Sequence, residues 1–262
     1  MRRRVRNGDG PAHDFGMNAF PTERGRSGLV GREVVALIAV ACGLLFVAYT
    51  WKLAGERKRK EILSFQNLQQ WGIALNLSLI ENNHTLPEVG PRQPDLSAEA
   101  AWYNLLPPYL AQPSLASVPM DQRPQPGTRS LWVDPLSRKG ESPPPGQTFF
   151  GYGMNRFLHP APKSPRLRIH ALENPAETVF LAEVSGADPG AMPSQVIFRR
   201  GERAPSPDAR AYVLFCDGHA SLVTKGQLID DPAGVDTEAP PPSGVRWVPS
   251  AGSPMPDLYQ IE

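Results

Sequence analysis

The sequence has few cysteines and no excess of charge of either sign. Its 262 residues include only Cys42 and Cys216, which excludes a disulfide-rich scaffold. Lys and Arg together number 27 and Asp and Glu number 26, so the net charge is +1. General nucleic-acid binding normally requires a basic excess, and we therefore expect no nucleic-acid partner.

The sequence also lacks the short motifs of common enzymes and metal sites. It contains no G-x-S-x-G, P-loop, C-x-x-C or H-E-x-x-H pattern. Cys216, Asp217 and His219 stand close together, but a closed metal site needs three or four converging ligands, and an Asp-Gly hairpin turn accounts for the same residues. We predict that the protein is not an enzyme and has no cofactor or bound metal.

Proline is missing from residues 34 to 86, although the chain has 30 prolines in all. Within this stretch, Val34 to Trp51 carries no charge and, with its flanks, is long enough as a helix to cross a hydrocarbon core of about 30 Å. Seven arginines precede the apolar run, and Lys52 and the basic run Arg57 to Lys60 follow it. We predict one membrane-spanning helix at about 34–53, in contact with lipid, with a slight preference for a cytoplasmic N-terminus.

The pattern after the apolar run predicts that the same helix continues outside the membrane. Residues spaced by three and four share one helical face. They are Phe65, Leu68, Gly72, Leu75 and Leu79, and Ile62, Ile73 and Leu77 widen the stripe. Asn82 and Asn83, followed by Pro87, are typical of a helix end.

Two N-terminal segments carry a family resemblance. Gly28 is followed by Leu29 and, as the fifth residue, Glu33, just before the apolar run; this resembles a type IV prepilin processing site. The stretch NLQQWGIALNLSLIENNHTLP resembles the corresponding region of pseudopilin-like proteins of the type II secretion class. The residues in register are Asn67, Leu68, Gln70, Gly72, Ala74, Leu75, Asn82, Asn83, Leu86 and Pro87.

This resemblance implies processing and assembly. A prepilin peptidase would cut between Gly28 and Leu29, the new N-terminus would be methylated, and Glu33 would pair with the N-terminal ammonium of a neighbouring subunit. An unpaired charge in the membrane would be costly, which gives such a pairing a physical reason. Arg32 departs from the apolar start usual in the family.

The sequence pattern of the C-terminal half predicts short strands joined by turns. The candidate strands are residues 147–152, 166–172, 178–184, 195–200, 211–216 and 219–224, with weaker candidates at 130–134 and 244–248. Asp217-Gly218 predicts a two-residue hairpin turn that pairs Phe215 with Ala220 and Val213 with Leu222. A short helix is expected at 97–106, with Ser97 as its N-cap.

This half also resembles pseudopilin-like proteins with a C-terminal H-x9-DG domain. The matching residues are Tyr152, Gly153, Met154 and Asn155 in GYGMN, and Asp217, Gly218 and His219 in VLFCDGH. Pro207 stands where the family has its histidine, so the role of that histidine is not carried over.

The expected organisation is a basic leader at 1–28, a pilin-like helix at 29–86, a head at 87–229 with a proline-rich loop at about 107–146, and a proline-rich tail at 230–262. The fold class is α+β, with the long helix followed by a small antiparallel sheet. The resemblance implies a single-pass subunit of the bacterial inner membrane with a periplasmic head, which packs with other pilin or pseudopilin subunits into a filament. The alternative is a membrane-tethered extracytoplasmic binding module that is neither processed nor assembled, which Arg32 and the lost histidine favour.

Overall fold

A computed structural model describes residues 27–91, 93, 95–159, 165–201, 206–228 and 244–248, with side chains from position 33 onward. The expected leader therefore lies outside the described residues except for Ser27 and Gly28, and the expected tail lies outside them except for 244–248. The chain divides into two compact units, Met1–Leu53 and Ala54–Glu262.

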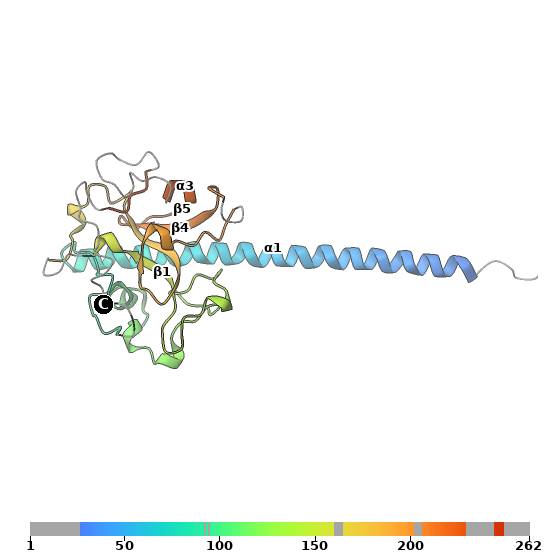
Figure 1. The fold of residues 1–262 in the computed structure, drawn as a ribbon, viewed down its shortest axis with the longest axis horizontal. Helices are drawn as coiled ribbons and strands as arrows, with labels where there is room; N and C mark the ends of the chain where they lie inside the picture. Colours follow the sequence, from blue (N-terminus) through green and yellow to red (C-terminus); the bar gives the residue numbers. More distant parts are fainter. Residues whose placement is uncertain are drawn as a thin grey trace, which may run out of the picture. The chain divides into compact units, whose positions relative to one another are not determined.

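Helix α1 spans Ser27–Glu81, 55 residues, and belongs to both units (Figure 1). In the first unit, every described side chain from Glu33 to Leu53 is exposed. An 18-residue window of this helix has a mean hydropathy of 2.3. Helix α1 is thus long and apolar enough to cross a membrane, in agreement with the predicted anchor.

Helix α1 ends at Glu81, beside the asparagine pair that predicts its end and within the segment 29–86 expected to hold it. Asn83 and His84 adopt left-handed conformations, with φ of 52° and 59°. The backbone N–H of His84 donates to the Leu79 carbonyl at 2.7 Å, which is the 6→1 hydrogen bond of a Schellman motif. The helix stops here because these two left-handed residues turn the backbone away before Pro87.

The second unit contains a five-stranded sheet in the order β3-β1-β2-β4-β5. The strands are β1 (Phe150–Asn155), β2 (Val179–Gly186), β3 (Gly190–Ala191), β4 (Arg210–Phe215) and β5 (Ala220–Thr224). Pairs β1–β2, β2–β4 and β4–β5 are antiparallel, whereas the two-residue β3 pairs parallel to β1. The fold is α+β as expected, but the sheet is mixed rather than antiparallel, because the turn after β2 returns the chain along the free edge of β1.

Four expected strands do not form strands of the sheet. Residues 130–134 form turns, and 166–172 contain a 3-10 turn at Ile169–Ala171 and hydrogen-bond to the residues that follow α1. Residues 195–200 and 244–248 contribute single bridges, Arg200 to Arg210 and Arg246 to Thr178. The backbones of these segments bond to loops or pair at single positions only. Their amino-acid composition favours a strand but does not show whether a neighbouring strand is available.

The β4–β5 hairpin pairs one residue out of the expected register. Leu214 faces Ala220 and Val213 faces Ser221. Three residues rather than two form the loop, because the backbone N–H of Phe215 donates to the His219 carbonyl at 2.9 Å. Gly218, with φ of 91°, supplies the left-handed residue that such a three-residue loop needs.

The connection between helix and sheet is built from short helical turns. Helix α2 covers only Trp102–Leu105, and its N-cap is Ala101 rather than Ser97, because Ser97 instead donates its backbone N–H to Asp95. Pro107–Leu110 forms a 3-10 turn directly afterwards. The proline-rich loop 107–146 continues as further short turns without a strand.

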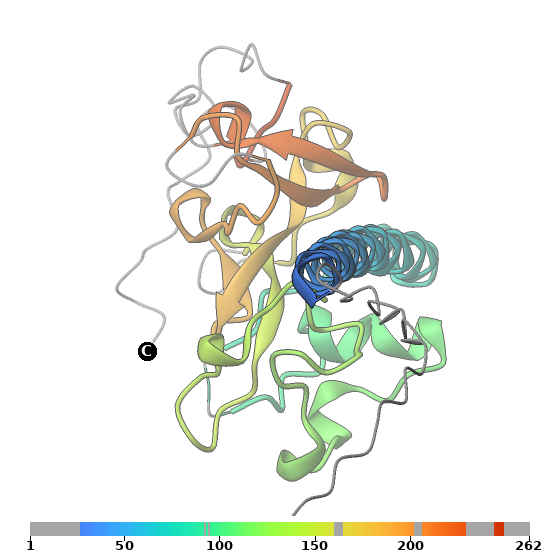
Figure 2. The same cartoon turned by 90° about the vertical axis from the view of Figure 1, so that its right-hand side faces the viewer.

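Two hydrophobic cores lie on opposite faces of the sheet. The first, the helix-side core, packs the second-unit part of α1 against the sheet and the loops, with Trp71 edge-on to Trp102 (5.4 Å between ring centroids) and to Trp132 (6.1 Å). The second gathers around Phe215 and Trp247. The cyan part of α1 accordingly lies between the orange β4–β5 hairpin and the green connecting loops (Figures 1 and 2).

Candidate functional site

The candidate site is the contact between α1 and the head, where the helix backbone comes very close to the β4–β5 turn. Gly72 of α1 meets the turn of the β4–β5 hairpin, and a Cβ added at Gly72 would lie 2.2 Å from the Gly218 carbonyl oxygen. One turn later, the Asn76 amide nitrogen donates to the Asp217 carbonyl at 3.4 Å. The helix therefore touches the backbone of the Asp-Gly turn directly, and glycine at position 72 permits this approach.

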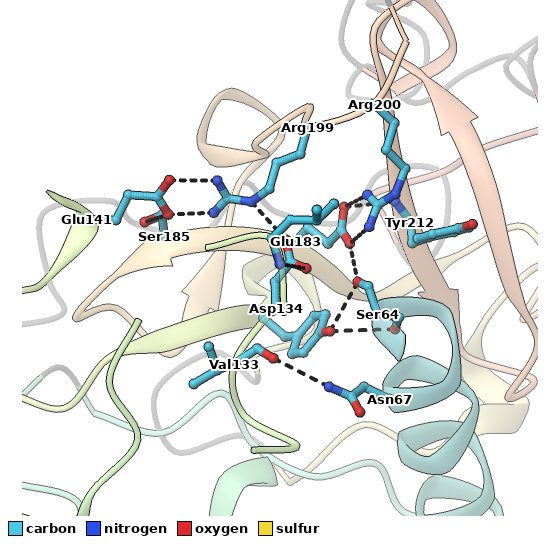
Figure 3. Close-up of polar contacts among 12 residues, drawn as sticks. Ser64, Asn67, Val133, Asp134, Glu141, Glu183, Ser185, Arg199, Arg200 and Tyr212 are labelled. Carbon is cyan, nitrogen blue, oxygen red and sulfur yellow. Dashed lines mark hydrogen bonds and ion pairs between the residues drawn. The ribbon is translucent and has the colours of Figure 1, made fainter. Parts of the chain in front are cut away.

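A buried ion pair lies beside the same helix (Figure 3). Glu183 of β2 is fully buried and accepts from both terminal nitrogens of Arg200, at 2.8 Å for Nη2 and more closely for Nη1. Its oxygens also accept from the Ser64 hydroxyl at 2.6 Å and from the backbone N–H of Tyr212 at 3.1 Å. Ser64 is on α1, so this carboxylate connects the helix to the centre of the sheet.

The Ser64 hydroxyl is itself held on a second side. Because its hydrogen is donated to Glu183, its oxygen can accept from the Tyr152 hydroxyl, which lies 3.2 Å away. Tyr152 is fully buried on β1. Strands β1 and β2 thus share one hydrogen-bond network with helix α1.

A second ion-pair group extends this network into the loops (Figure 3). Arg199 donates to Asp134 at 2.7 Å through Nε, and to both oxygens of Glu141 at 2.7 Å through its terminal nitrogens. The Ser185 hydroxyl also donates to Glu141, at 2.9 Å. This fork ties the end of the proline-rich loop to the segment that leads to β4.

The ionisation of Glu183 depends on its surroundings. Burial and the nearby negative charge of Asp134 raise the pKa of Glu183 to about 7, against the opposing effect of Arg200. Burial lowers the pKa of Arg200, but the adjoining Glu183 carboxylate outweighs it, and the net direction is upward. Burial and Asp134 thus favour the neutral form of Glu183, and the adjoining guanidinium of Arg200 favours the charged form.

Three more of the residues in register with the pseudopilin pattern, Asn67, Asn82 and Pro87, are hydrogen-bonded or buried at the helix and its end. The Asn67 amide donates to the carbonyls of Ser130 and Val133, at 3.2 and 3.4 Å. Asn82 donates to the Ser78 carbonyl at 2.9 Å, and Pro87 is buried. These positions fix the end of the helix and its contact with the loop.

The GYGMN residues lie in the first strand of the sheet. Gly153 and Met154 pair with β2, and the Met154 side chain is in the helix-side core. The Asn155 amide donates to the carbonyls of Val179 and Trp247, at 2.8 and 2.7 Å, and its oxygen accepts from the backbone of Phe157. Asn155 thus holds β1, β2 and residues 244–248 together.

Cys216, Asp217 and His219 do not converge on a common point. Cys216 is buried in the helix-side core, where burial raises the pKa of its thiol well above the ordinary value. His219 is exposed, stacks on Phe215 at 4.4 Å, and has its Nδ1 2.7 Å from an Asp217 oxygen. Within the described ranges, no three His, Cys, Asp or Glu side chains are placed to hold a metal.

The expected processing residues lie at the start of α1. Gly28 and Leu29 have a helical backbone, and the Leu29 side chain is outside the described set. Glu33 is exposed and forms no ion pair with any residue whose side chain is described.

The ion-pair residues were not among the sites expected from the sequence. A signal was present, since Glu183 is the one charged residue of the apolar stretch 178–184, and Arg199 and Arg200 close the apolar stretch 195–200. A charge inside an apolar strand points to a buried partner, but the sequence does not identify which distant residue it is.

No protein family, curated protein or solved structure matches this chain in comparisons with each. Close backbone contact at Gly72 and the hydrogen bond from Ser64 to Glu183 join the second-unit part of α1 to the sheet of that unit.

Proposed function

We propose that the protein is a pseudopilin-like structural subunit of a type II secretion or type IV pilus-related assembly. Its helix would be inserted in the bacterial inner membrane with a cytoplasmic N-terminus and a periplasmic head, and would pack with other subunits into a filament. The observation that carries the proposal is helix α1, one helix of 55 residues. Its described side chains from Glu33 to Leu53 are all exposed, and its later part packs against the sheet of the head.

An apolar helix in a membrane needs partners before it leaves. About twenty apolar residues lose favourable transfer free energy if they enter water, roughly 1.5–3 kcal/mol for each large side chain. Extraction is therefore favourable only when neighbouring helices or a motor compensate. A filament of packed α1 helices provides that compensation.

The second-unit part of α1 also retains an apolar surface suited to a neighbouring helix. Ile62, Ile73, Leu77 and Ile80 are 49%, 56%, 42% and 72% exposed. At 100° per residue they fall within about 60° of one another around the helix. Ile62, Ile73 and Leu77 were expected to widen the apolar stripe. With Ile80 they instead form a separate exposed face, which would pack on other subunits.

Processing is part of the proposal. A prepilin peptidase would cut after Gly28, and the exposed carboxylate of Glu33 would then be available to the N-terminal ammonium of an adjacent copy. A charge pair in a low-dielectric environment is much stronger than in water, so it would set the register between helices. The protein would act mechanically, without catalysis or a cofactor.

The second candidate is a tethered binding module. Arg32 beside Glu33, and Pro207 in place of the family histidine, favour this candidate. Both functions use the same membrane helix, so they differ in whether α1 contacts other subunits.

Photo-crosslinking separates the two candidates. A photoreactive amino acid at Ile73 is compared with the same group at Asp121, an exposed position in the head loops, in cells with an active type II secretion system. Assembly predicts crosslinks from position 73 to a second copy or another subunit, and none from 121. A membrane-inserted protein that gives no crosslink from position 73 contradicts assembly and supports the tether.

A further inference from the structure

A hollow of about 850 Å³ opens between the beginning of the second-unit part of α1 and two loop segments. Arg57 and Lys60 line it from the helix, where they share a face because they are three residues apart. Arg138 and Lys139 line it from the end of the proline-rich loop. Segments about eighty residues apart in the sequence thus bring four cations to one concave surface.

Positive charge is in excess in this hollow. Arg199 is a fifth cationic lining residue, and Glu141 is the acidic one among the described lining residues. Both Glu141 oxygens are already bound by Arg199, at 2.7 Å each. Lys60, Arg138 and Lys139 form no ion pair with another residue of the described part.

Arg57 is exposed, but two hydrogen bonds orient its side chain. It donates to the Arg199 carbonyl at 3.1 Å and to Glu61 at 3.3 Å. The first bond connects the helix to the segment that forms the far wall of the hollow. The cationic site is therefore preorganised on at least one side, which lowers the entropic cost of binding an anion.

The geometry points to a binding site for a phosphate ester anion, carried by an anionic phospholipid or free in solution. Guanidinium and ammonium groups are the donors that phosphate oxygens accept most strongly, and like charges lining a concavity reinforce one another's potential. Ile197 and Phe198 add an apolar part to the lining, which suits the glycerol and acyl region of a lipid.

The position of Arg57 in the chain favours the lipid. It stands four residues after Leu53, the last residue of the apolar unit. Four residues span at most about 14 Å even when fully extended, so Arg57 stays within reach of the headgroup layer in any arrangement of the two units.

Titration of the full-length chain in non-ionic detergent tests this site. The probes are dihexanoyl phosphatidylglycerol below its micelle concentration, its phosphatidylcholine counterpart, and inorganic phosphate, with binding followed by calorimetry. The variant Arg138→Ala/Lys139→Ala removes two cations from the hollow. The matched control Lys58→Ala/Arg59→Ala removes two exposed cations from the same helix region that do not line it.

The site predicts saturable binding of phosphatidylglycerol that weakens at least about tenfold in the first variant, and less than about twofold in the control. The same pattern with inorganic phosphate identifies free phosphate as a ligand, whereas a response to the lipid alone identifies the headgroup. If the loop variant loses its native melting transition, Lys60→Gln against Lys58→Gln gives the same comparison. Equal weakening in hollow and control variants, or no saturable binding of either probe, would overturn the proposal.

Discussion

Replacing Gly72 with alanine tests the contact between α1 and the hairpin turn most sharply. The added Cβ would lie 2.2 Å from the Gly218 carbonyl oxygen and 3.1 Å from a Leu214 methyl group. An ordinary contact requires at least 3.4 Å, so the turn must move away by about 1 Å. Because the obstacle is backbone, rotation of a side chain cannot relieve the clash.

The same helix offers a matched control at Gly55. A Cβ added there has no atom within 4 Å. Both substitutions gain about 1 kcal/mol of helix propensity, so the difference between the two variants isolates the packing cost. Overpacking of this kind costs about 1–3 kcal/mol, and the displaced backbone places the expected difference near 3 kcal/mol.

The assay is urea unfolding of the full-length chain in detergent, followed by the fluorescence of the tryptophans around Trp71. Gly72→Ala should lower the unfolding midpoint, and Gly55→Ala should leave it unchanged or raise it. A difference below about 0.5 kcal/mol between the two variants would refute the inference that helix and turn meet at van der Waals contact.

Two further substitutions test the buried ion pair, and a third tests the hydrogen bonds of Asn155. The pKa of Glu183 is raised from 4.5 to about 7. Its stabilising contribution, about 3 kcal/mol, is therefore complete below pH 4.5 and is lost as the pH rises through 7. Glu183→Gln should flatten this fall of the urea midpoint with rising pH, and an unchanged slope contradicts the assignment. Arg200→Ala at pH 8 leaves the Glu183 carboxylate without its cation and should lower the free energy of unfolding by about 3–5 kcal/mol. The control Arg138→Ala, at an exposed position, should change it by less than about 0.5 kcal/mol. Similar losses in the two variants would count against the ion pair. Asn155→Ala removes donors to two buried carbonyls and should lower the unfolding free energy by about 2 kcal/mol, with a loss under 0.5 kcal/mol disproving that role.

Local patterns in the sequence were sufficient for the long helix and for most of the sheet. The proline-free stretch and its apolar run predict α1, and the paired asparagines predict its end near position 82. The strands of the sheet with strong β propensity, 150–155, 179–186, 210–215 and 220–224, overlap the expected ones. These features depend on periodicity and capping, which neighbouring residues determine.

The hairpin register needed information that the sequence pattern does not contain. Asp217-Gly218 suits both a two-residue and a three-residue loop, and the backbone bond between Phe215 and His219 selects the second. A shift of one residue changes which side chains share a face. The parallel pairing of the two-residue strand β3 was likewise invisible, because so short a strand has no periodicity.

The ion-pair network could be anticipated only in part. A carboxylate such as Glu183 in an apolar strand signals a buried partner, but Arg200 is 17 residues away and Ser64 is 119 residues away in the sequence. Such long-range pairs are set by the packing of helix on sheet. The exposure of Ile73 had the same origin, since its side of α1 is left uncovered by the head.

The proposed assembly depends most directly on cleavage of the leader. Intact mass measurement of the protein extracted from membranes of cells with an active prepilin peptidase, compared with a strain lacking that enzyme, tests it. The proposal predicts a chain that begins at Leu29 and carries one N-terminal methyl group, with the uncut chain recovered only from the strain without the peptidase. A chain that still begins at Met1 in both strains would contradict the processed, filament-forming subunit.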